Sequence, residues 1–228
     1  MIVAHFAYVV ILGYLLGSIP FGVLIGKRLA KVDIRGHGSG KIGTTNVLRT
    51  AGKKAAALAF TLDMSKGALA VAFAGLIVGR NYLVIGDFGL GLLVAQALAA
   101  LAAMAGHNWS VFLKFKGGRG VATFFGGLIA LCPVAGLFGG EVFIIGAGLT
   151  RFASLGSIAG AVGTYTILVP LTIMNGFPLE YLVYALIGTI VIIVMHRDNI
   201  ARLMSGKERK LGEKAKGMDS SPSGEGAG

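Results

Sequence analysis

Residues 121–150 read VATFFGGLIALCPVAGLFGGEVFIIGAGLT, a run of 30 mostly apolar residues. One membrane helix needs only about 20 such residues to cross the hydrocarbon core. Proline inside a helix removes a backbone hydrogen bond and clashes with the preceding turn, and Cys132-Pro133 lies near the middle of this run. We therefore predict two helices here, over 121–132 and 134–150, of which the first is short for a full crossing.

The rest of the chain is also unusually apolar. Of its 228 residues 55% are hydrophobic and only 14% are charged, whereas soluble domains carry roughly 25% charged residues. Further apolar segments lie near residues 2–25, 55–79, 83–105, 153–174 and 179–195. The predicted fold is thus all-α, a polytopic transmembrane helical bundle of about seven helices. An integral membrane domain is expected over 1–206, followed by a polar tail over 207–228 that we expect to be disordered.

The distribution of basic residues predicts the orientation of the bundle. The chain has 21 Lys and Arg residues, and only Lys66 and Arg80 fall outside four segments. Seven crossings would place all four segments on the same side: 26–54, 106–120, Arg151 and 196–228. Positive residues gather on the cytoplasmic side of a membrane, so we expect the N-terminus outside and the C-terminus in the cytoplasm. A single crossing over 121–150 would put the last segment outside, which is why we prefer seven.

Small residues at helical spacing predict close helix packing. Gly13 and Gly17, Gly22 and Gly26, and Gly156 and Gly160 are each four apart, a spacing that lets membrane helices approach closely. Cys132 is the one cysteine of the chain, so no intrachain disulfide is expected.

Three polar stretches interrupt the apolar pattern, and the first reads GSGKIGTTNVLR over residues 38–49. Glycines let backbone N–H groups approach an anion, and an arginine can hold a phosphate through two parallel hydrogen bonds. The stretch is not a nucleotide P-loop, because Lys41 is followed by Ile42 and not by Ser or Thr. A cytoplasmic loop without a binding role is the alternative. The candidate phosphate ligands here are Ser39, Gly40, Gly43, Thr45, Asn46 and Arg49.

The second stretch, KFKGGRGVAT over residues 114–123, runs directly into an apolar helix. Helix N-termini attract phosphates through free N–H groups and the helix dipole, and Lys116 and Arg119 would add full charges. Ordinary basic anchoring at the membrane surface is the alternative, although the glycines Gly117, Gly118 and Gly120 argue against it.

The third stretch is HRDNIARL over residues 196–203, followed by Glu208. If it is helical, His196, Asn199 and Arg202 are three apart and share one face. An imidazole, an amide and a guanidinium together suit a phosphate or a polarised acyl group, whereas a basic cap on the last helix is the alternative. No second His or Cys stands at metal-ligand spacing, so no metal site is predicted.

Four weaker candidates lie within the predicted helices. Asp63 and Lys66 are three apart, and ionisable groups in membrane helices are costly and often functional. A structural ion pair explains them equally well. Ser154 and Ser157 stand at the cytoplasmic start of the sixth helix, where serines either bind a ligand or pack and cap the helix.

Taken together, the three stretches resemble the three signature motifs of the bacterial acylphosphate:glycerol-3-phosphate acyltransferase family. The segments GSIPFG at 17–22 and SLGS at 154–157 are similar to that family as well, and the resemblance extends from about Tyr14 to Glu208. Departures are Lys41 for the usual asparagine, Thr44 for alanine, Arg119 for lysine, and the absence of proline from residues 108–110. Arg119 keeps the positive charge of the usual lysine. Its guanidinium, however, is a planar group with several N–H donors, whereas the ammonium of lysine acts as a compact point charge.

The resemblance implies transfer of a fatty acyl group from acyl phosphate to glycerol 3-phosphate, giving 1-acyl-glycerol 3-phosphate and phosphate. It implies no cofactor, a bacterial cytoplasmic (inner) membrane, and an active site on the cytoplasmic face. Partners would be membrane lipid and, functionally, an enzyme that makes acyl phosphate, with no nucleic acid. No histidine here is followed five residues later by an aspartate, which separates the chain from the acyltransferases that use His-x-x-x-x-Asp.

We expect catalytic roles for His196, Asn199, Lys116 and Arg119. His196 would act as general base, or the donor's own phosphate would take the hydroxyl proton; both options are open. Substrate binding is expected at Ser39, Gly40, Gly43, Thr45, Asn46, Arg49, Gly117, Gly118, Gly120, Ser154, Ser157, Arg202 and Glu208.

Two other functional classes fit a basic membrane protein. A transporter for a phosphorylated metabolite tends to bind near the bilayer midplane and often has internal pseudo-symmetry. A structural subunit would bind anionic lipid headgroups and would not need glycine-rich loops. The candidates cluster at one membrane face and no repeat is visible, which favours the enzyme.

Overall fold

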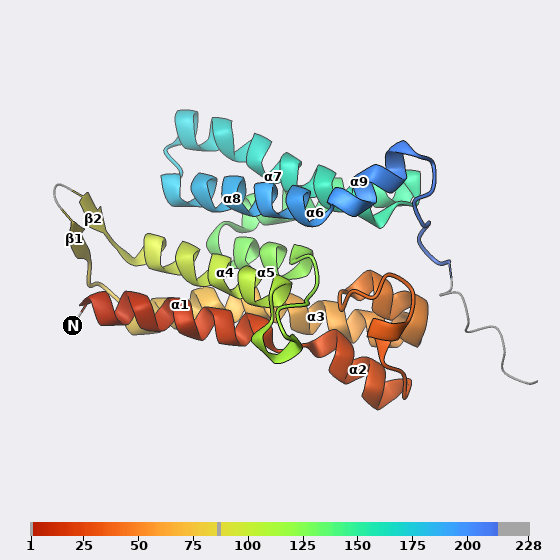
Figure 1. The fold of residues 1–228 in the computed structure, drawn as a ribbon. Helices are drawn as coiled ribbons and strands as arrows, with labels where there is room; N and C mark the ends of the chain where they lie inside the picture. The colour runs from red at the N-terminus through yellow and green to blue at the C-terminus, as the bar shows by residue number, and fades with distance from the viewer. Residues whose placement is uncertain (1, 86–87, 214–228) are drawn as a thin grey trace, which may run out of the picture.

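The chain folds as a bundle of long helices, and its polar connections lie between the middle of the bundle and the end opposite the N-terminus (Figure 1). The computed structural model describes residues 2–85 and 88–213. The helices are α1 (Ile2–Ser18), α2 (Phe21–Leu29), α3 (Thr44–Val78), α4 (Leu92–Asn108), α5 (Val121–Leu131), α6 (Pro133–Thr150), α7 (Ala153–Asn175), α8 (Leu179–Met195) and α9 (Arg197–Met204). Two short 3-10 turns, η1 (Ile34–Gly36) and η2 (Val111–Leu113), lie in the connections.

Length and composition identify the helices that cross a membrane. Within the described residues five segments qualify, and a sixth qualifies if α8 and α9, which meet at a 59° bend, are taken together. The predicted polytopic all-α fold is therefore confirmed. Helix α5 is apolar but has 11 residues, so the number of crossings and the side on which each terminus lies stay predictions.

The predicted break at Pro133 is confirmed. Helix α5 ends at Leu131, and Pro133 is the first residue of α6, a position where the missing N–H of proline costs no hydrogen bond. Helix α5 packs against α3, α4, α6 and α8, so it occupies the centre of the bundle. Its first residues therefore start inside the bundle, among the polar connections.

Two of the predicted helix boundaries are wrong. The segment expected as a helix over 83–105 begins with an antiparallel hairpin of β1 (Leu83–Ile85) and β2 (Phe88–Leu90), in which Leu83 pairs with Leu90. The helix starts only at Leu92, after two glycines that disfavour helix. The segment expected as one helix over 2–25 breaks at Ile19-Pro20, because the residue before a proline is kept out of the helical region.

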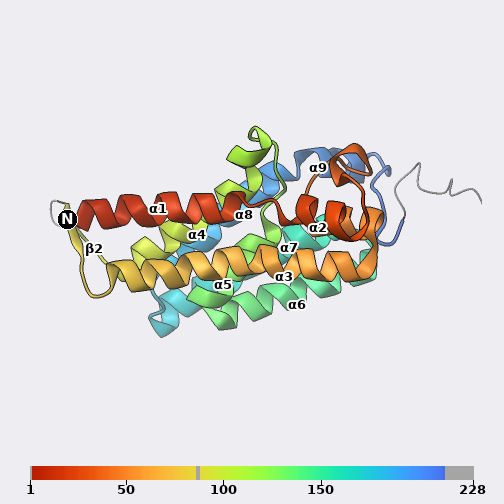
Figure 2. The ribbon, with the colours of Figure 1, turned by 90° about the horizontal axis from the view of Figure 1, so that it is seen from below.

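Helix α3 begins earlier than expected. The apolar segment was expected near residues 55–79, but α3 starts at Thr44 and runs alongside α1 and α2 for nearly the whole length of the bundle (Figure 2). After the break at Gly52, residues 53–78 are 26 residues and span about 39 Å at 1.5 Å per residue, whereas the hydrocarbon core is about 30 Å thick. The excess carries the second half of the first motif, Thr44–Arg49, beyond the core. Gly52, with φ 84° and ψ 179°, bends the helix between these two parts.

Two of the three glycine pairs pack against a neighbouring helix as predicted, whereas Gly22 and Gly26 pack against the connection that contains Ile34 and Ile42. A Cβ atom on Gly13 or Gly17 would overlap the backbone of α4, and one on Gly160 would lie 2.7 Å from the Gly139 carbonyl oxygen of α6. The core between α5 and α8 is aromatic: the rings of Phe124 and Tyr184 stack at 5.4 Å. The Tyr184 hydroxyl donates a hydrogen bond of 2.9 Å to the Phe124 carbonyl, which fixes α8 against the central helix.

The close approach of α1 and α4 can be tested by substitution. We expect Gly17→Val to lower the free energy of unfolding by about 1–3 kcal/mol, because the new side chain meets the Ala103 backbone. A thermal melt of the purified protein in detergent measures the change. Gly140→Ala is the control, since a Cβ there has no atom within 4 Å and alanine favours helix. An unchanged melting midpoint for Gly17→Val would contradict this packing.

Candidate functional site

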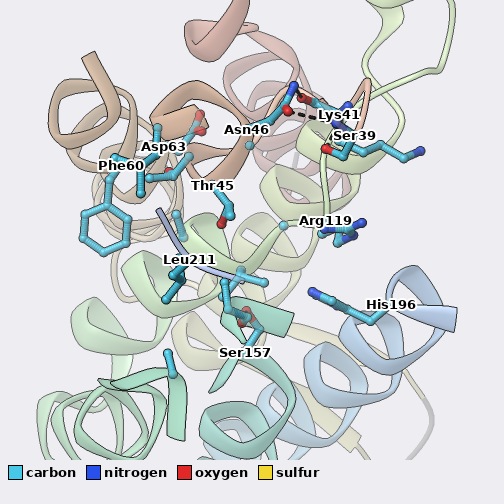
Figure 3. Close-up of a pocket in the computed structure, with 18 of the residues that line it drawn as sticks. Ser39, Lys41, Thr45, Asn46, Phe60, Asp63, Arg119, Ser157, His196 and Leu211 are labelled. Carbon is cyan, nitrogen blue, oxygen red and sulfur yellow. Dashed lines mark hydrogen bonds between the residues drawn. The ribbon is translucent and has the colours of Figure 1, made fainter. Parts of the chain in front are cut away.

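Residues from all three polar stretches line one cavity of about 280 Å³ at the end of the bundle that carries these connections (Figure 3). The first stretch contributes Ser39 and Thr45, the second Arg119 and the third His196, as Figure 3 shows. Convergence of the three stretches, predicted from sidedness alone, is thereby confirmed. The lining residues that were predicted as site residues are Ser39, Gly43, Thr45, Asn46, Arg49, Arg119, Gly120, Ser157 and His196.

The cavity has an apolar part and a polar extension. Apolar side chains of α3, α5, α6 and the segment after α9 line it, namely Leu48, Phe60, Val121, Phe143 and Leu211. A smaller polar pocket adjoins it and shares Thr45, Arg49, Arg119, Ser157 and His196. Ser154, Asn199 and Glu208 line only this extension. A ligand with a long apolar part and a polar ligand would thus meet at the shared residues.

Asn46 holds the first loop together with its side chain. Its amide nitrogen donates to the carbonyls of Ile34 at 2.8 Å and Lys41 at 2.9 Å, and its oxygen accepts from the Ser39 backbone N–H at 3.0 Å. Because the side chain is buried and its polar atoms are occupied by the loop, Asn46 shapes the loop that presents Ser39 and Thr45. This geometry differs from the expected direct contact with a substrate.

Arg49 lies at the mouth of the cavity. One Nη atom donates to the backbone carbonyls of Arg209 at 3.2 Å and Lys210 at 3.3 Å. Carbonyl oxygens carry only partial charge, so a phosphate would compete well for this guanidinium.

The second stretch positions Arg119 by its backbone. Gly117 and Gly118 donate hydrogen bonds to the carbonyls of Asn108 at 3.1 Å and His107 at 2.9 Å. Gly120 has φ 73°, a left-handed conformation that glycine adopts without strain, and α5 begins at the next residue. Lys116 and Gly40, both predicted site residues, are exposed and line neither cavity.

Arg119 is half-buried and lines both cavities. In residues 2–85 and 88–213 no carboxylate lies within salt-bridge distance of it, and its Nε atom has no hydrogen-bond partner. Burial lowers the pKa of the Arg119 guanidinium to about 10, and the positive charge of Arg202 acts in the same direction. Arg119 therefore stays charged at neutral pH and is available for an anionic ligand.

His196 stands between α8 and α9 and is neutral at physiological pH. Its Nδ1 atom lies 2.8 Å from the Ile192 carbonyl; since a carbonyl only accepts, Nδ1 carries the proton and Nε2 is left as an acceptor. Burial and the nearby charge of Arg119 lower the pKa of His196 to about 4. In Figure 3 the ring points into the cavity toward Arg119.

Glu208 connects the third stretch to α7. The predicted helix is confirmed as α9, and Asn199 and Arg202 on it donate to the two Glu208 carboxyl oxygens at 2.7 and 2.8 Å. The Ser154 hydroxyl donates to the same carboxylate at 2.9 Å, whereas Ser157 bonds to the Ala153 carbonyl of its own helix. Burial alone would raise the pKa of Glu208, but the three hydrogen bonds outweigh it and lower the pKa below the usual value.

The start of the expected disordered tail lies against the site. The Leu211 N–H donates to the Arg151 carbonyl at 2.7 Å, and the Leu211 side chain lines the cavity. Residues 207–213 thus close one side of it, whereas 214–228 lie outside the described residues.

Sequence reasoning missed several residues that line the cavity. His107, Leu211 and Phe143 carry no local pattern that marks them, because each reaches the cavity through the packing of a distant element. Asp63, left open as a structural or functional residue, also lines it. No group of three His, Cys, Asp or Glu residues that could hold a metal ion occurs in the described part of the chain.

Known proteins resemble the chain over most of its length. The family model described as glycerol-3-phosphate acyltransferase matches residues 7–206. The chain is 65% identical over 216 residues to glycerol-3-phosphate acyltransferase 3 of Dehalococcoides mccartyi (strain CBDB1), which covers 95% of this chain and 100% of that relative. It is 41% identical to the glycerol-3-phosphate acyltransferase of Clostridioides difficile (strain 630), over 92% of this chain and 98% of that relative.

Solved structures agree with these relatives. The fold superimposes with a TM-score of 0.78 on the glycerol 3-phosphate form of PlsY (YgiH), described as an integral membrane glycerol 3-phosphate acyltransferase. The two chains are 38% identical, and the match covers 91% of this chain and 96% of the other. The lysophosphatidic acid form of PlsY superimposes with a TM-score of 0.76 at 36% identity, covering 90% and 94% of the two chains.

The Glu208 contacts predict a pH dependence of stability. Because the folded-state pKa is lowered, ionised Glu208 stabilises the fold above the usual carboxyl pKa of about 4.3, and this contribution disappears as pH falls through the lowered value. We expect Glu208→Gln to lower the melting midpoint by the same amount from pH 8 to about pH 5, and by less at more acidic pH. Thermal melts across this pH range measure the difference in melting midpoint between the wild-type protein and Glu208→Gln, with Glu180→Gln as control. A difference that grows at acidic pH would contradict the stabilising role of ionised Glu208.

Proposed function

Because the chain belongs to the glycerol-3-phosphate acyltransferase family, we propose that it takes its acyl group from a fatty acyl phosphate and forms 1-acyl-glycerol 3-phosphate. The chain is an acyltransferase and a membrane protein with several apolar helices. The finer assignment of donor, product and residue roles is our proposal. It draws on the family resemblance and on the chemistry of the two cavities.

The observation that carries this proposal is the half-buried Arg119, which lines two adjoining cavities and has no carboxylate within salt-bridge distance among the described residues. Withdrawing a charge partly from water without a partner is costly, so this half-buried guanidinium favours a ligand of opposite charge. Both proposed substrates carry a phosphate. Solved PlsY structures described as glycerol 3-phosphate and lysophosphatidic acid forms support a site for a small phosphorylated alcohol and for its acylated product.

We assign the acyl phosphate to the larger cavity and glycerol 3-phosphate to the polar extension. The apolar side chains of Phe60 and Phe143 suit a fatty chain that enters from the membrane. Arg49 and Ser154 suit a soluble phosphorylated alcohol. Thr45, Arg119 and His196 line both spaces, so the two reacting groups would meet beside them.

The reaction is a nucleophilic substitution at an activated carbonyl. A glycerol hydroxyl oxygen forms a bond to the acyl carbon, the bond from that carbon to the phosphate oxygen breaks, and phosphate leaves with the electron pair. Negative charge develops on the carbonyl oxygen and on the departing phosphate. Arg119 would stabilise this charge, since it is fixed by the glycine loop before the reaction begins.

The hydroxyl proton has two candidate acceptors. A general base works best when its pKa lies near the working pH, and the His196 pKa of about 4 is far below neutral. The second pKa of a phosphate is near 6, so the departing phosphate would take the proton more readily. We therefore favour substrate assistance, with neutral His196 accepting a hydrogen bond through Nε2 from the other glycerol hydroxyl, so that the proton of the reacting hydroxyl stays free for the phosphate.

We further propose that the enzyme lies in the bacterial cytoplasmic membrane with this site facing the cytoplasm. The basic segments gather at the site end of the bundle, as expected for the cytoplasmic side. Soluble glycerol 3-phosphate would reach the site from that side. A functional link to an enzyme that supplies acyl phosphate follows from the proposed donor.

A two-substrate assay tests the proposal. Purified protein in lipid is given acyl phosphate and glycerol 3-phosphate, and released phosphate is measured. We expect release in amounts equal to the acylated product, and only when both substrates are present. The same protein in sealed vesicles distinguishes the alternative: uptake of glycerol 3-phosphate without turnover would identify a transporter and contradict the proposal.

Substitution of His196 separates the two proton acceptors. We expect His196→Gln to lower kcat by less than about tenfold, because the amide oxygen can still accept a hydrogen bond, whereas loss of a true general base costs about 100-fold or more. Steady-state rates measure the effect, with His5→Gln as a control outside the cavity. A fall of 100-fold or more with unchanged KM would favour His196 as the base.

A further inference from the structure

A buried group of three ionisable residues lies behind the glycine loop, Gly117–Gly120. Asp63 and Lys66 stand one turn apart on α3, with the Lys66 Nζ atom 2.6 Å from the Asp63 Oδ1 atom. Their side chains are 1% and 2% exposed. The Phe21 ring of α2 lies over the Lys66 ammonium, 5.0 Å from Nζ to the ring centroid.

Stability alone does not explain this pair. Removing two charges from water costs more than their attraction commonly returns, so a buried pair often contributes less than apolar residues of the same size. In a membrane helix the cost is higher still, and such residues tend to be functional. A role beyond packing is therefore expected for Asp63 and Lys66.

His107 joins the pair to the glycine loop. Its Nδ1 atom lies 3.5 Å from Asp63 Oδ1 and 3.4 Å from Lys66 Nζ, so the ring is held on that side by one of them: a protonated Nδ1 donates to Asp63, and an unprotonated one accepts from Lys66. The His107 carbonyl accepts the hydrogen bond from Gly118, and a Cβ atom on Gly118 would overlap the opposite edge of the ring, at Nε2. The imidazole therefore fills the space between the ion pair and the loop.

We propose that Asp63, Lys66 and His107 form a positioning network that sets the place of Arg119 in the site. The inference rests on the proposed function, because it concerns the same phosphate-binding site. The ion pair fixes the ring, the ring supports Gly118, and Arg119 is the next residue along the loop. None of the three needs to touch a substrate for this role.

Lys66 has a second task in the same network. Asp63 lines the cavity, and a lone carboxylate there would repel both phosphorylated substrates. Lys66 neutralises that charge without placing its own ammonium among the cavity residues.

The test removes the network charges but keeps the side-chain volumes. In the double variant Asp63→Asn with Lys66→Met no buried charge is left unpaired, so we expect the protein to fold. We expect its kcat/KM for glycerol 3-phosphate to fall roughly tenfold, because a small displacement of a fixed charge is enough. The control is Arg80→Met with Glu180→Gln, which also removes one charge of each sign but far from the glycine loop.

Combining the double variant with Arg119→Ala distinguishes a positioning role that acts through Arg119 from a purely structural role of the network. If the network acts through Arg119, the double change costs less than about twofold in that background, since changes that act through one group are not additive. Inorganic phosphate provides a second readout without turnover. We expect it to raise the melting midpoint of the wild-type protein more than that of the double variant.

The outcomes distinguish the network from the proposed function. A folded double variant with wild-type kcat/KM would overturn the network, and so would a tenfold loss that persists in the Arg119→Ala background. If the double variant does not fold, His107→Gln, which removes the ring under Gly118 and keeps the backbone, is judged by the same two measurements. A wild-type protein without two-substrate turnover would instead refute the proposed function, and the phosphate-dependent melts would still decide the network.

Discussion

The site depends on how closely backbones approach at the central helix α5. A Cβ atom on Gly67 of α3 would overlap the carbonyl of Thr123, and one on Gly126 would overlap the carbonyl of Met64. Glycine at both positions lets α3 and α5 touch without side chains between them. Because α5 is only 11 residues long, its first turn starts within the bundle and not at its surface. The glycine loop that precedes it is thereby drawn inward, and Arg119 lines the cavity as a half-buried charge.

The distribution of charge around the cavity follows from that placement. Arg49, Arg119 and Arg202 lie near enough to influence one another, and such a cluster is unfavourable unless negative charge balances it. Glu208 offsets part of it by binding Arg202. The remaining positive charge is what an anionic substrate would meet.

Much of this arrangement could be predicted from the sequence. The lengths of the apolar runs and the position of Pro133 predicted the helices. The distribution of basic residues predicted that three distant stretches lie on the same side of the bundle. Both predictions succeed because membrane insertion and the placement of positive charge depend on each segment by itself. The sequence did not reveal which side chains support the site and which line it: the Asn46 amide is bonded to its own loop, and Lys116 is exposed and lines neither cavity. His107 and Leu211 escaped notice since their roles arise from contacts between elements far apart in the chain. The hairpin at 83–90 was hidden because short apolar strands and helix ends look alike by hydropathy.

The segment after α9 has a consequence for how the protein is made. Glu208 and Leu211 follow every described helix in chain order, yet they complete the wall of the cavity and the bonding of Ser154 and Asn199. During synthesis all the helices can enter the membrane before these residues leave the ribosome. An unfinished chain would therefore have its spans inserted but its cavity open on one side. The cavity can therefore bind a ligand only after translation has passed the last helix and these residues have joined its wall.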